Sequence, residues 1–333
     1  MAIFSIKKSL IIVLFLLAFL CTFFLLQVYT PISSEDSPAI VYDVKAGDGY
    51  KIIAQNLADQ MIIKSKLFFE LHVLLSGKYS KLQAGKYYIS PSMSIAEMAE
   101  KFYQGDVAKQ QLLTLPGWTI YDIAQYLQDQ NFTSKENFLN LASQNFNKDF
   151  NFLGSKPNGL TLEGYLFPDK YYVTESQDVN DLMKAMLVNF GSKLTPELRI
   201  AIAAQHKSIF QIVTMASILE KEVRSIQDKK IVSGILWKRL VNGMPLQVDA
   251  TLDYAGRGSF TNKVAKDSSY NTYKYIGLPG GPISNPGLES IIAAVYPEKS
   301  DFWYYLSAKK TGKTIFSKTF LEHQAAIIKY LHN

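Results

Sequence analysis

The sequence predicts an α+β fold behind an N-terminal membrane helix, and three observations lead to this prediction. One unbroken apolar run, residues 10–26, stands near the start of the 333-residue chain. Short strand–turn–helix patterns follow it. From about residue 151, helical segments and scattered strands alternate irregularly, which favours a larger mixed α+β domain over a doubly wound sheet.

The apolar run has the length of a membrane span, because about 17–25 apolar residues cross a bilayer core. We therefore expect a transmembrane anchor at residues 10–28. Lys7 and Lys8 precede it, so residues 1–9 are expected in the cytoplasm and the rest of the chain outside the cytoplasmic membrane. A cleaved signal peptide is the alternative, but its apolar region is shorter and no small-x-small cleavage site follows. A polar linker is predicted at residues 29–39.

Composition narrows the classes of function. The net charge of +6 is spread along the chain without a dense Lys/Arg block, which argues against nucleic-acid binding. The single cysteine, Cys21, lies inside the apolar run and so excludes disulfides and thiol chemistry in the exported part. The four histidines lie far apart in the sequence, and we predict neither a metal site nor a cofactor.

A strand, a turn and an amphipathic helix recur in the first part of the exported chain. Val44 and Gly47 precede apolar helix positions at residues 53, 54 and 57, and Leu115 and Gly117 precede positions 123, 124 and 127. A looser copy begins at Ile89. Units of this size cannot bury their apolar faces alone, so we expect them to pack on each other.

The first copy, VKAGDGYKIIAQNL, resembles the opening of a LysM module, a small glycan-binding fold. The stretch from Lys64 to Ile89 holds a candidate second helix and closing strand for such a module. We therefore predict a LysM-like subdomain at residues 40–110 and a larger domain at residues 111–333. From this region alone, glycan binding and plain packing are equal alternatives.

In the larger domain the periodicity predicts helices at residues 179–194, 196–204, 209–226 and 229–242. A loop-rich stretch follows residue 243. A short helix from residue 287, an aromatic strand, a hairpin through Thr311 and Gly312 and a last helix from residue 318 end the chain.

The predicted helix at residues 209–226 carries two candidate acids. Its apolar positions form one broad stripe, and at 100° per residue Glu220 and Glu222 flank this stripe about 160° apart. Burial at an apolar edge raises the pKa of a carboxyl group, which suits a proton donor. The alternative is a solvated EKE patch, although the polar face of the helix is narrow. Periodicity does not choose between the two glutamates.

Polar and aromatic side chains in the loops give a second clue, because such loops carry the binding groups of many enzymes. Aromatic faces beside amides and carboxylates suit a sugar polymer, while turn residues and hydrophobic plugs are the alternative. The residues are Gln247, Asp249, Thr251, Tyr270, Asn271, Thr272 and Tyr273.

Five motifs occur in a fixed order: LEGYLFPD, ASILEKE, KRLVNGMPLQVDATLDYAG, SYNTYKYIGLPGGPISNPG and FSKTFLEH. Together they resemble the endolytic murein transglycosylases of the MltG (YceG-like) family, from about residue 112 to the end. The anchor and the LysM-like segment also fit this family. The resemblance implies cleavage of the MurNAc-β-1,4-GlcNAc bond within peptidoglycan strands, with 1,6-anhydroMurNAc ends, and a role in terminating nascent strands. Wall-synthesis and division proteins are implied as partners.

The resemblance also implies that the first glutamate of E-K-E, Glu220, is the catalytic acid/base. An attacking hydroxyl within the substrate removes the need for the second carboxylate that hydrolytic glycosidases use. Lys313 and Gln324 depart from the family pattern, which leaves substrate contacts near them open. Other matching motif positions are expected to bind substrate or support the site: Glu163, Gln247, Asp249, Asn271 and Tyr273.

Three other functions are alternatives to this one. The main alternative is a non-enzymatic LysM-type protein that binds peptidoglycan or serves as a scaffold for wall synthesis. A lyase acting on a small cytosolic metabolite conflicts with the predicted anchor. A muramidase that uses water would leave reducing ends instead of anhydro ends.

Overall fold

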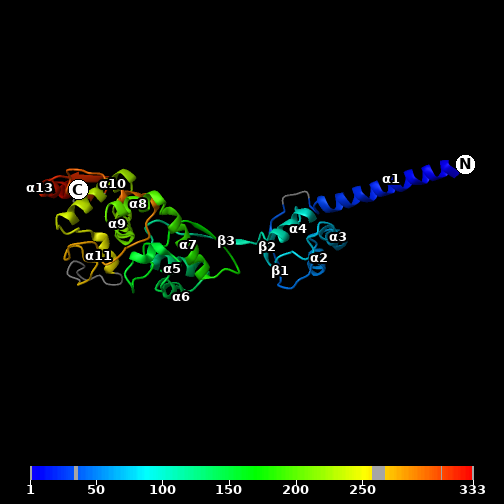
Figure 1. Cartoon of the computed structure of the whole chain (residues 1–333), viewed down its shortest axis with the longest axis horizontal. Helices are drawn as coiled ribbons and strands as arrows, with labels where there is room; N and C mark the ends of the chain where they lie inside the picture. The colour runs from blue at the N-terminus through cyan, green and yellow to red at the C-terminus, as the bar shows by residue number, and fades with distance from the viewer. Residues whose placement is uncertain (1, 34–36, 257–266, 309, 332–333) are drawn as a thin grey trace. The chain divides into compact units, whose positions relative to one another are not determined.

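The structure is a computed structural model that describes residues 2–33, 37–256, 267–308 and 310–331. The chain divides into two compact units. The first unit comprises Met1–Gln110 with Tyr172–Gln177, and the second comprises Gln111–Tyr171 with Asp178–Asn333. Helices with three two-stranded sheets among them make the fold α+β, as predicted (Figure 1).

The first unit contains a two-stranded antiparallel sheet with helices packed beside it. Its strands pair from Ile40 with Ile89 to Val44 with Gly85. The predicted second helix and closing strand are both present. The elements are α1 (Ala2–Tyr29), β1 (Ile40–Val44), α2 (Tyr50–Asp59), α3 (Lys66–Leu75), β2 (Gly85–Ile89) and α4 (Ile95–Gln104).

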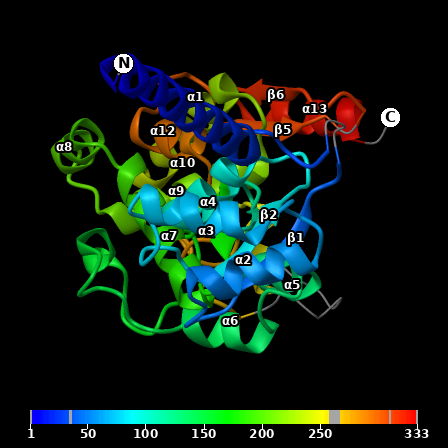
Figure 2. The same ribbon diagram turned by 90° about the vertical axis from the view of Figure 1, so that its right-hand side faces the viewer.

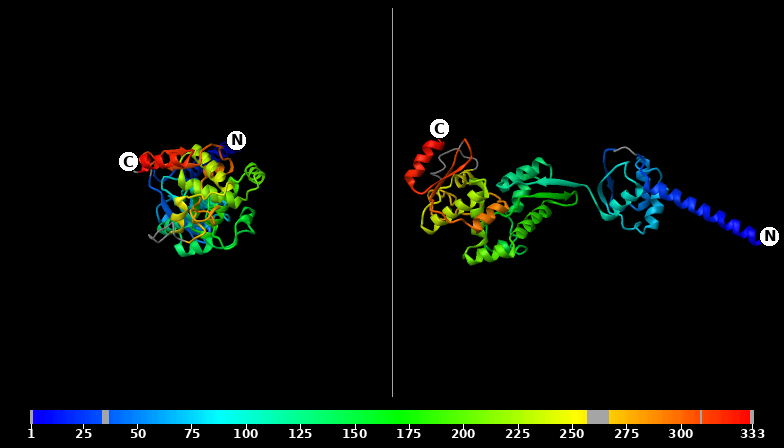
Figure 3. Two further views of the ribbon diagram at one scale, coloured as in Figure 1. Left: turned by 90° about the vertical axis from the view of Figure 1, so that its left-hand side faces the viewer. Right: turned by 90° about the horizontal axis from the view of Figure 1, so that it is seen from above.

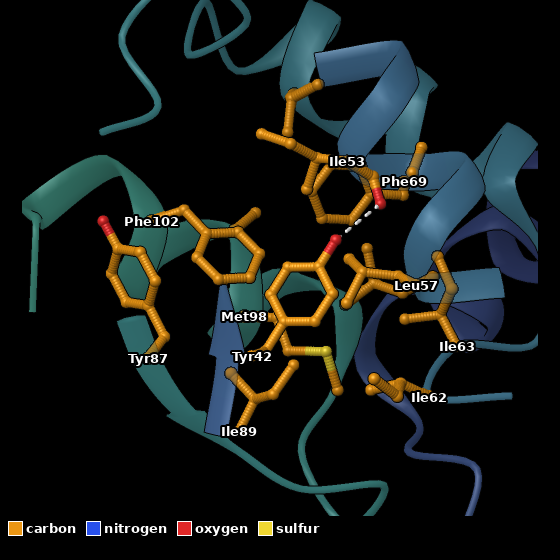
Figure 4. Packing of buried hydrophobic residues seen from close by; sticks show 14 of the residues in the cluster. Tyr42, Ile53, Leu57, Ile62, Ile63, Phe69, Tyr87, Ile89, Met98 and Phe102 are labelled. Carbon is orange, nitrogen blue, oxygen red and sulfur yellow. Dashed lines mark hydrogen bonds between the residues drawn. The ribbon is translucent and has the colours of Figure 1, made fainter. Parts of the chain in front are cut away.

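Aromatic and aliphatic side chains together fill the core of the first unit (Figure 4). The rings of Tyr87 and Phe102 meet edge to face with centroids 4.8 Å apart. The Tyr42 hydroxyl, buried among them, donates to the carbonyl oxygen of Ile53 at 3.3 Å. Each large apolar side chain that is fully buried contributes roughly 1.5–3 kcal/mol, so this small unit has a core of its own.

Helix α1 joins the candidate membrane span to this core. The span is Leu10–Tyr29, with a mean hydropathy of 2.9. In the right-hand view of Figure 3, α1 leaves the first unit as one long helix (blue). Val28, near its end, is fully buried in the core. Directly after the helix, the backbone N–H groups of Ile32 and Ser33 donate to the carbonyl oxygen of Pro91. Ile32 and Ser33, in the segment predicted as a polar linker, are thus hydrogen-bonded to the chain before α4.

The third strand–turn–helix copy begins where the second unit begins, since the division after Gln110 falls within its strand β3 (Lys109–Leu113), which pairs with β4 (Lys170–Thr174). Its helix α5 (Ile120–Asp129) belongs to the second unit and packs against α6 (Lys135–Ala142). The expected single group of three copies is thus divided between the two units.

The rest of the second unit is mostly helical, with a C-terminal hairpin. Strands β5 and β6 pair from Tyr304 with Ser317 to Ser307 with Thr314, and α13 packs on both (Figure 2). The elements are η1 (Asn151–Ser155), α7 (Val179–Lys193), α8 (Pro196–Ala204), α9 (Ile209–Glu222), α10 (Ile226–Val241), α11 (Asp249–Ala255), α12 (Leu288–Val295), β5 (Tyr304–Ser307), β6 (Thr314–Ser317) and α13 (Phe320–Leu331).

Helix α9 ends earlier than the predicted residue 226. Val223 takes an extended conformation, with φ −143° and ψ 151°, and Ser225 caps the next helix by accepting a hydrogen bond from the Asp228 N–H. The predicted loop after residue 243 also contains a short helix, α11. Both differences place the end of α9 beside the segment that carries Gln247 and Asp249.

Helix α9 is the buried centre of the second unit, packed against α8, α10, α11 and α12. The narrow polar face of the helix is buried as well. Thr214 and Ser217 are both 0% exposed, and the Ser217 hydroxyl accepts a hydrogen bond from the Ile283 N–H at 3.0 Å. The glycine- and proline-rich loop before α12 covers this face at Ser217.

Candidate active site

A cavity of about 510 Å³ lies at the C-terminal end of α9. Its walls come from segments far apart in the sequence: the ends of α9 and α10, the chain before α11, the loop at Tyr273, strand β5 and helix α13. The polar residues that line it include Glu222, Arg239, Gln247, Asp249, Tyr273 and Tyr305. Three of the five predicted binding or supporting residues, Gln247, Asp249 and Tyr273, therefore come together here.

Glu222, the last residue of α9, is the glutamate of this helix that lines the cavity. Burial removes water from its carboxyl group and raises its pKa to about 7. The nearby carboxylates of Asp249 and Asp253 act in the same direction, while hydrogen bonds with Tyr305 and with the Ala250 backbone oppose the shift. The helix C-terminus also disfavours negative charge. This carboxyl group can therefore both donate and accept a proton near neutral pH.

A tyrosine and a second carboxylate form the opposite part of the site. The Tyr273 hydroxyl donates to Asp249 Oδ1 at 2.6 Å. The bond fixes the direction of the Asp249 side chain inside the cavity. Tyr305 is half-buried beside Glu222, and the loss of water around its hydroxyl raises the pKa of Tyr305 well above its ordinary value. Both tyrosines therefore remain neutral hydrogen-bond donors over the physiological pH range.

The backbone around Gln247 is strained. Its φ is +55°, in the left-handed region that few residues other than glycine adopt. Such a conformation costs on the order of 1 kcal/mol or more and persists when its surroundings hold it. Here the Gln247 N–H donates to the Thr272 carbonyl oxygen at 3.0 Å, and the Val248 N–H donates to the Thr272 hydroxyl at 3.0 Å. These two hydrogen bonds hold the strained backbone in place and so fix the point from which the Gln247 side chain reaches the cavity.

Asn271 supports the site from behind. It is 1% exposed, and its Oδ1 accepts hydrogen bonds from the N–H groups of Tyr273 and Lys274, each at 3.1 Å. These bonds shape the turn that presents Tyr273. Asn271 is therefore a positioning residue rather than part of the cavity wall that the structure describes.

Glu220 has surroundings different from those expected. Its Oε2 accepts hydrogen bonds from the Gly287 N–H at 2.9 Å and the Ser290 hydroxyl at 2.7 Å, and Lys229 Nζ lies 3.2 Å from Oε1. The expected apolar edge is thus a polar, hydrogen-bonded niche at the N-terminus of α12, where a carboxylate is favourable. Glu220 is not among the described residues that line the cavity.

Glu163 also lies away from this cavity wall. It is 3% exposed and accepts hydrogen bonds from the Ile120 N–H, from the Tyr254 hydroxyl at 3.1 Å and from Asn285 Nδ2 at 3.0 Å. Asn285 in turn accepts from the N–H groups of Gly164 and Leu166. This network joins the LEGYLFPD segment to the loop before α12, so Glu163 stabilises the packing of these two segments.

Gly164, within the same segment, is required by close packing. Its φ is +89°, and a Cβ atom there would lie 2.7 Å from Val213 Cγ1 of α9 and 2.6 Å from Pro282 Cβ. The segment therefore lies directly on α9, and any side chain at residue 164 would push α9 away.

Residues that were not predicted as site residues also line the cavity, among them Arg239, Tyr304, Tyr305 and His323. Arg239 is 4% exposed and donates to the carbonyl oxygens of Trp303 and Leu246 at 2.9 and 2.8 Å. Arg239 therefore links the start of β5 to the segment before α11. The aromatic run FWYYLSA predicts a strand, but strand alternation places the adjacent residues Tyr304 and Tyr305 on opposite faces, so it gives no signal that both line the cavity.

The two departures from the family pattern lie outside this cavity wall. Lys313 and Gln324 are both exposed, and neither belongs to the lining. Within the described residues, there is no group of three or more His, Cys, Asp or Glu side chains that could hold a metal ion.

Residues 42–329 match the YceG-like family, and the chain belongs to this family. A Bacillus subtilis protein named endolytic murein transglycosylase is 32% identical over 322 residues, which cover 90% of this chain and 87% of the relative. A Streptococcus pneumoniae protein of the same name is 26% identical over 93% of this chain, and the match spans 62% of that longer protein.

The fold is also similar to a crystal structure of a YceG-like protein from Listeria monocytogenes. The TM-score is 0.59 at 31% sequence identity, and the match covers 87% of this chain and 99% of the other. The similarity therefore extends over both units.

Proposed function

We propose that this protein is an endolytic lytic transglycosylase that cleaves the MurNAc-β-1,4-GlcNAc bond within peptidoglycan strands. The names of its relatives support the substrate and the reaction class. The observation that carries the chemistry is the Glu222 carboxyl group. It lines a cavity of about 510 Å³, and its pKa is raised to about 7.

In the proposed reaction Glu222 is first a general acid and then a general base. Its proton goes to the glycosidic oxygen as the bond from that oxygen to MurNAc C1 breaks. The resulting carboxylate takes the proton of the MurNAc C6 hydroxyl while O6 bonds to C1. The products are a free GlcNAc hydroxyl and a 1,6-anhydroMurNAc end, no water is consumed, and Glu222 regains its proton. Because the nucleophile is part of the substrate, one acid/base is sufficient.

The other cavity residues are assigned to binding. Asp249, oriented by Tyr273, accepts hydrogen bonds from sugar hydroxyls, and Gln247 pairs with an acetamido group or hydroxyl. Glu220 is proposed to hold the end of α9 against α12 and α10 instead of transferring protons. This changes the assignment that the family resemblance implied, and it makes the two glutamates of E-K-E separable by experiment.

For location, we propose that α1 is a single-pass anchor in the cytoplasmic membrane with its N-terminus in the cytoplasm. Lys7 and Lys8 at the start of the span support this orientation. The second unit would then act outside the membrane, where it meets nascent strands and the wall-synthesis and division proteins that extend them. Cleavage there would terminate strand elongation.

The first unit is proposed to bind glycan in a LysM-like manner. The order β1, α2, α3, β2 with antiparallel pairing of the two strands supports this proposal. A scaffold function alone does not account for the Glu222 cavity. We therefore propose that the first unit binds glycan in addition to the catalysis by the second unit.

The test compares Glu222→Gln with Glu220→Gln in the full-length protein on uncrosslinked glycan strands, with products identified by mass spectrometry. We expect Glu222→Gln to lose roughly 10²–10⁴-fold in rate while still binding glycan. Glu220→Gln should keep most of its activity per folded molecule. Loss of activity in folded Glu220→Gln, with Glu222→Gln active, would return the catalytic role to Glu220. Reducing MurNAc ends, heavier by one water than anhydro ends, would show a muramidase instead.

A further inference from the structure

We infer that helix α3 of the first unit lies in the surface of the lipid bilayer beside α1 and makes a second contact between the protein and the membrane. The inference rests on the proposal that α1 spans a membrane, and it adds a lipid-binding surface outside the catalytic unit.

Helix α3 is apolar on two opposite faces. Phe69 and Val73 are fully buried in the core of the first unit. On the opposite face an exposed stripe follows the helical repeat: Leu67 is 56% exposed, Leu71 36%, Leu74 42% and Leu75 76%. Four neighbouring leucines on one outward face of a ten-residue helix form an apolar patch, and such patches on soluble surfaces mark partners or membranes.

The stripe borders the candidate membrane span. The Phe68 ring of α3 meets Phe23 and Phe24 of α1, with ring centroids 5.7 and 6.0 Å apart. One turn further along α3, His72 meets Tyr29, with centroids 6.2 Å apart. In Figure 1, α3 lies on the side of the first unit from which α1 leaves. The α3 backbone is thus held against the last two turns of the span.

The depth of these contacts indicates the partner. Phe23 and Phe24 lie five or six residues before Tyr29, the end of the span. At 1.5 Å per residue they are about 8 Å inside that end. If the bilayer stopped short of Phe23 to leave α3 in water, only residues 10–22 would remain, about 20 Å of helix. A hydrocarbon core of about 30 Å needs a longer span. The span cannot be extended at its N-terminal end, because the charged residues Lys7 and Lys8 precede it.

The length of the span therefore brings the start of α3 to the boundary between headgroups and acyl chains. Interfacial helices bury their apolar face about 5–10 Å into this boundary, which matches the depth of the Phe68 contacts. The occupant of the leucine stripe is accordingly the lipid surface itself.

Charge around the stripe fits the same partner. Lys64 and Lys66 are exposed at the start of α3, and Lys81 is exposed after its end. Basic side chains at the border of an apolar stripe bind the phosphates of anionic lipids. Glu70 is the single acidic residue in the α3 sequence.

The contacts of α1 and α3 with the bilayer together restrict the orientation of the first unit. A lone span allows the attached unit to rotate about the helix axis, whereas α3 fixes which face of the first unit is turned to the lipid. The result is a defined height and orientation of the first unit above the bilayer.

The experiment places single cysteines in full-length protein that carries Cys21→Ser, reconstituted in vesicles of phosphatidylethanolamine and phosphatidylglycerol. An environment-sensitive fluorophore is attached at Leu71→Cys or Leu74→Cys, both on exposed positions that leave the core intact. Phe15→Cys, within the span, is the lipid control. Tyr88→Cys is the water control, because Tyr88 is 50% exposed on β2. Quenching by nitroxide-bearing lipids and by aqueous iodide is then measured.

We expect the labels at residues 71 and 74 to be quenched by the lipid nitroxides and to show a several-fold smaller iodide quenching constant than the label at residue 88. Labels at 71 and 74 that match residue 88, with residue 15 quenched by lipid, would overturn the inference while α1 remains an anchor. Iodide quenching at residue 15 as well would show that the anchor proposal has failed, and this inference with it.

Discussion

Lys229 Nζ lies 3.2 Å from Glu220 Oε1, and the two side chains are only 5% and 11% exposed. Glu220 also accepts hydrogen bonds from Gly287 and Ser290 at the start of α12. The pair thus fixes the last turn of α9 against both α10 and α12. Glu222 leaves this same turn, so the position of the proposed catalytic carboxyl depends on an ion pair that does not itself line the cavity.

Removing the ammonium of this pair should be costly. Lys229→Met leaves Glu220 buried without its counter-charge, and breaking a buried pair in this way costs about 3–5 kcal/mol. We expect a matching loss in the free energy of unfolding, measured by urea denaturation. Lys274→Met is the control, because Lys274 pairs with Asp267 at an exposed site and should change stability by at most about 1 kcal/mol. Equal effects of the two substitutions would contradict the structural role of Glu220.

The raised pKa of Glu222 predicts a pH-dependent stability. Its pKa is about 7 in the folded protein and 4.5 ordinarily. The folded state thus binds this proton more tightly than the unfolded state, and the Glu222 contribution becomes more destabilising as pH rises from about 4.5 to about 7. Glu222→Gln removes this cost. We expect the variant to be more stable than the wild type at pH 8, by up to about 3 kcal/mol, and similar to it at pH 4.

Thermal unfolding at the two pH values measures this difference. A Glu222→Gln protein that is less stable than the wild type at pH 8 would show that the carboxylate is favoured in the folded state, and that Glu222 is not poised to give up a proton.

The hydrogen bond with Tyr305 lowers the pKa of Glu222 against the effect of burial. Tyr305→Phe removes this donor, so the pKa of Glu222 should rise further. The rate of anhydroMurNAc formation should then decline at a higher pH than in the wild type, because the acid form persists longer. A pH–rate profile from pH 5 to 9 measures the shift. Tyr88→Phe, on a strand of the first unit, is the control, and an identical high-pH limb in Tyr305→Phe and Tyr88→Phe would rule out the contact.

Gly234 should not tolerate a methyl group. A Cβ atom at this residue would lie 1.9 Å from the carbonyl oxygen of Glu298, so α10 and the chain after α12 would have to separate. We expect Gly234→Ala to lose at least about 1–3 kcal/mol of stability. Gly154→Ala is the matched control, because nothing lies within 4 Å of the corresponding position. Chemical denaturation of both variants tests this, and a near-neutral Gly234→Ala would contradict the packing of α10.

Local signals in the sequence predicted much of the secondary structure. Helix α7 begins at Asp178, which forms a capping box with Asp181, and α8 begins at Thr195 followed by Pro196. A few residues specify where each of these helices begins, and the repeat of apolar residues indicates how far the helix continues. The early end of α9 also had a local signal, since Ser225 and Asp228 mark a new helix start.

The choice between Glu220 and Glu222 had no such signal. Both flank the same apolar stripe, and partners from distant segments distinguish them. Two of the three donors to Glu220 come from residues 67 and 70 positions further along the chain, and Tyr305 is more distant still from Glu222. The same limit applies to Glu163, whose motif suggested a site residue and whose partner, Asn285, is 122 positions away. Periodicity reports which face is buried, but it carries no information about what covers that face.

The burial of Val28 bears on the proposal that the apolar span is a retained anchor. A leader peptidase that cut after the apolar span would remove Phe24 and Val28, both of which pack in the core of the first unit. The mature product would then have a hole where an aliphatic side chain had been and would expose the aromatic ring of Phe68. Loss of α1 would consequently destabilise the first unit, because this candidate membrane span supplies part of the interior of that unit.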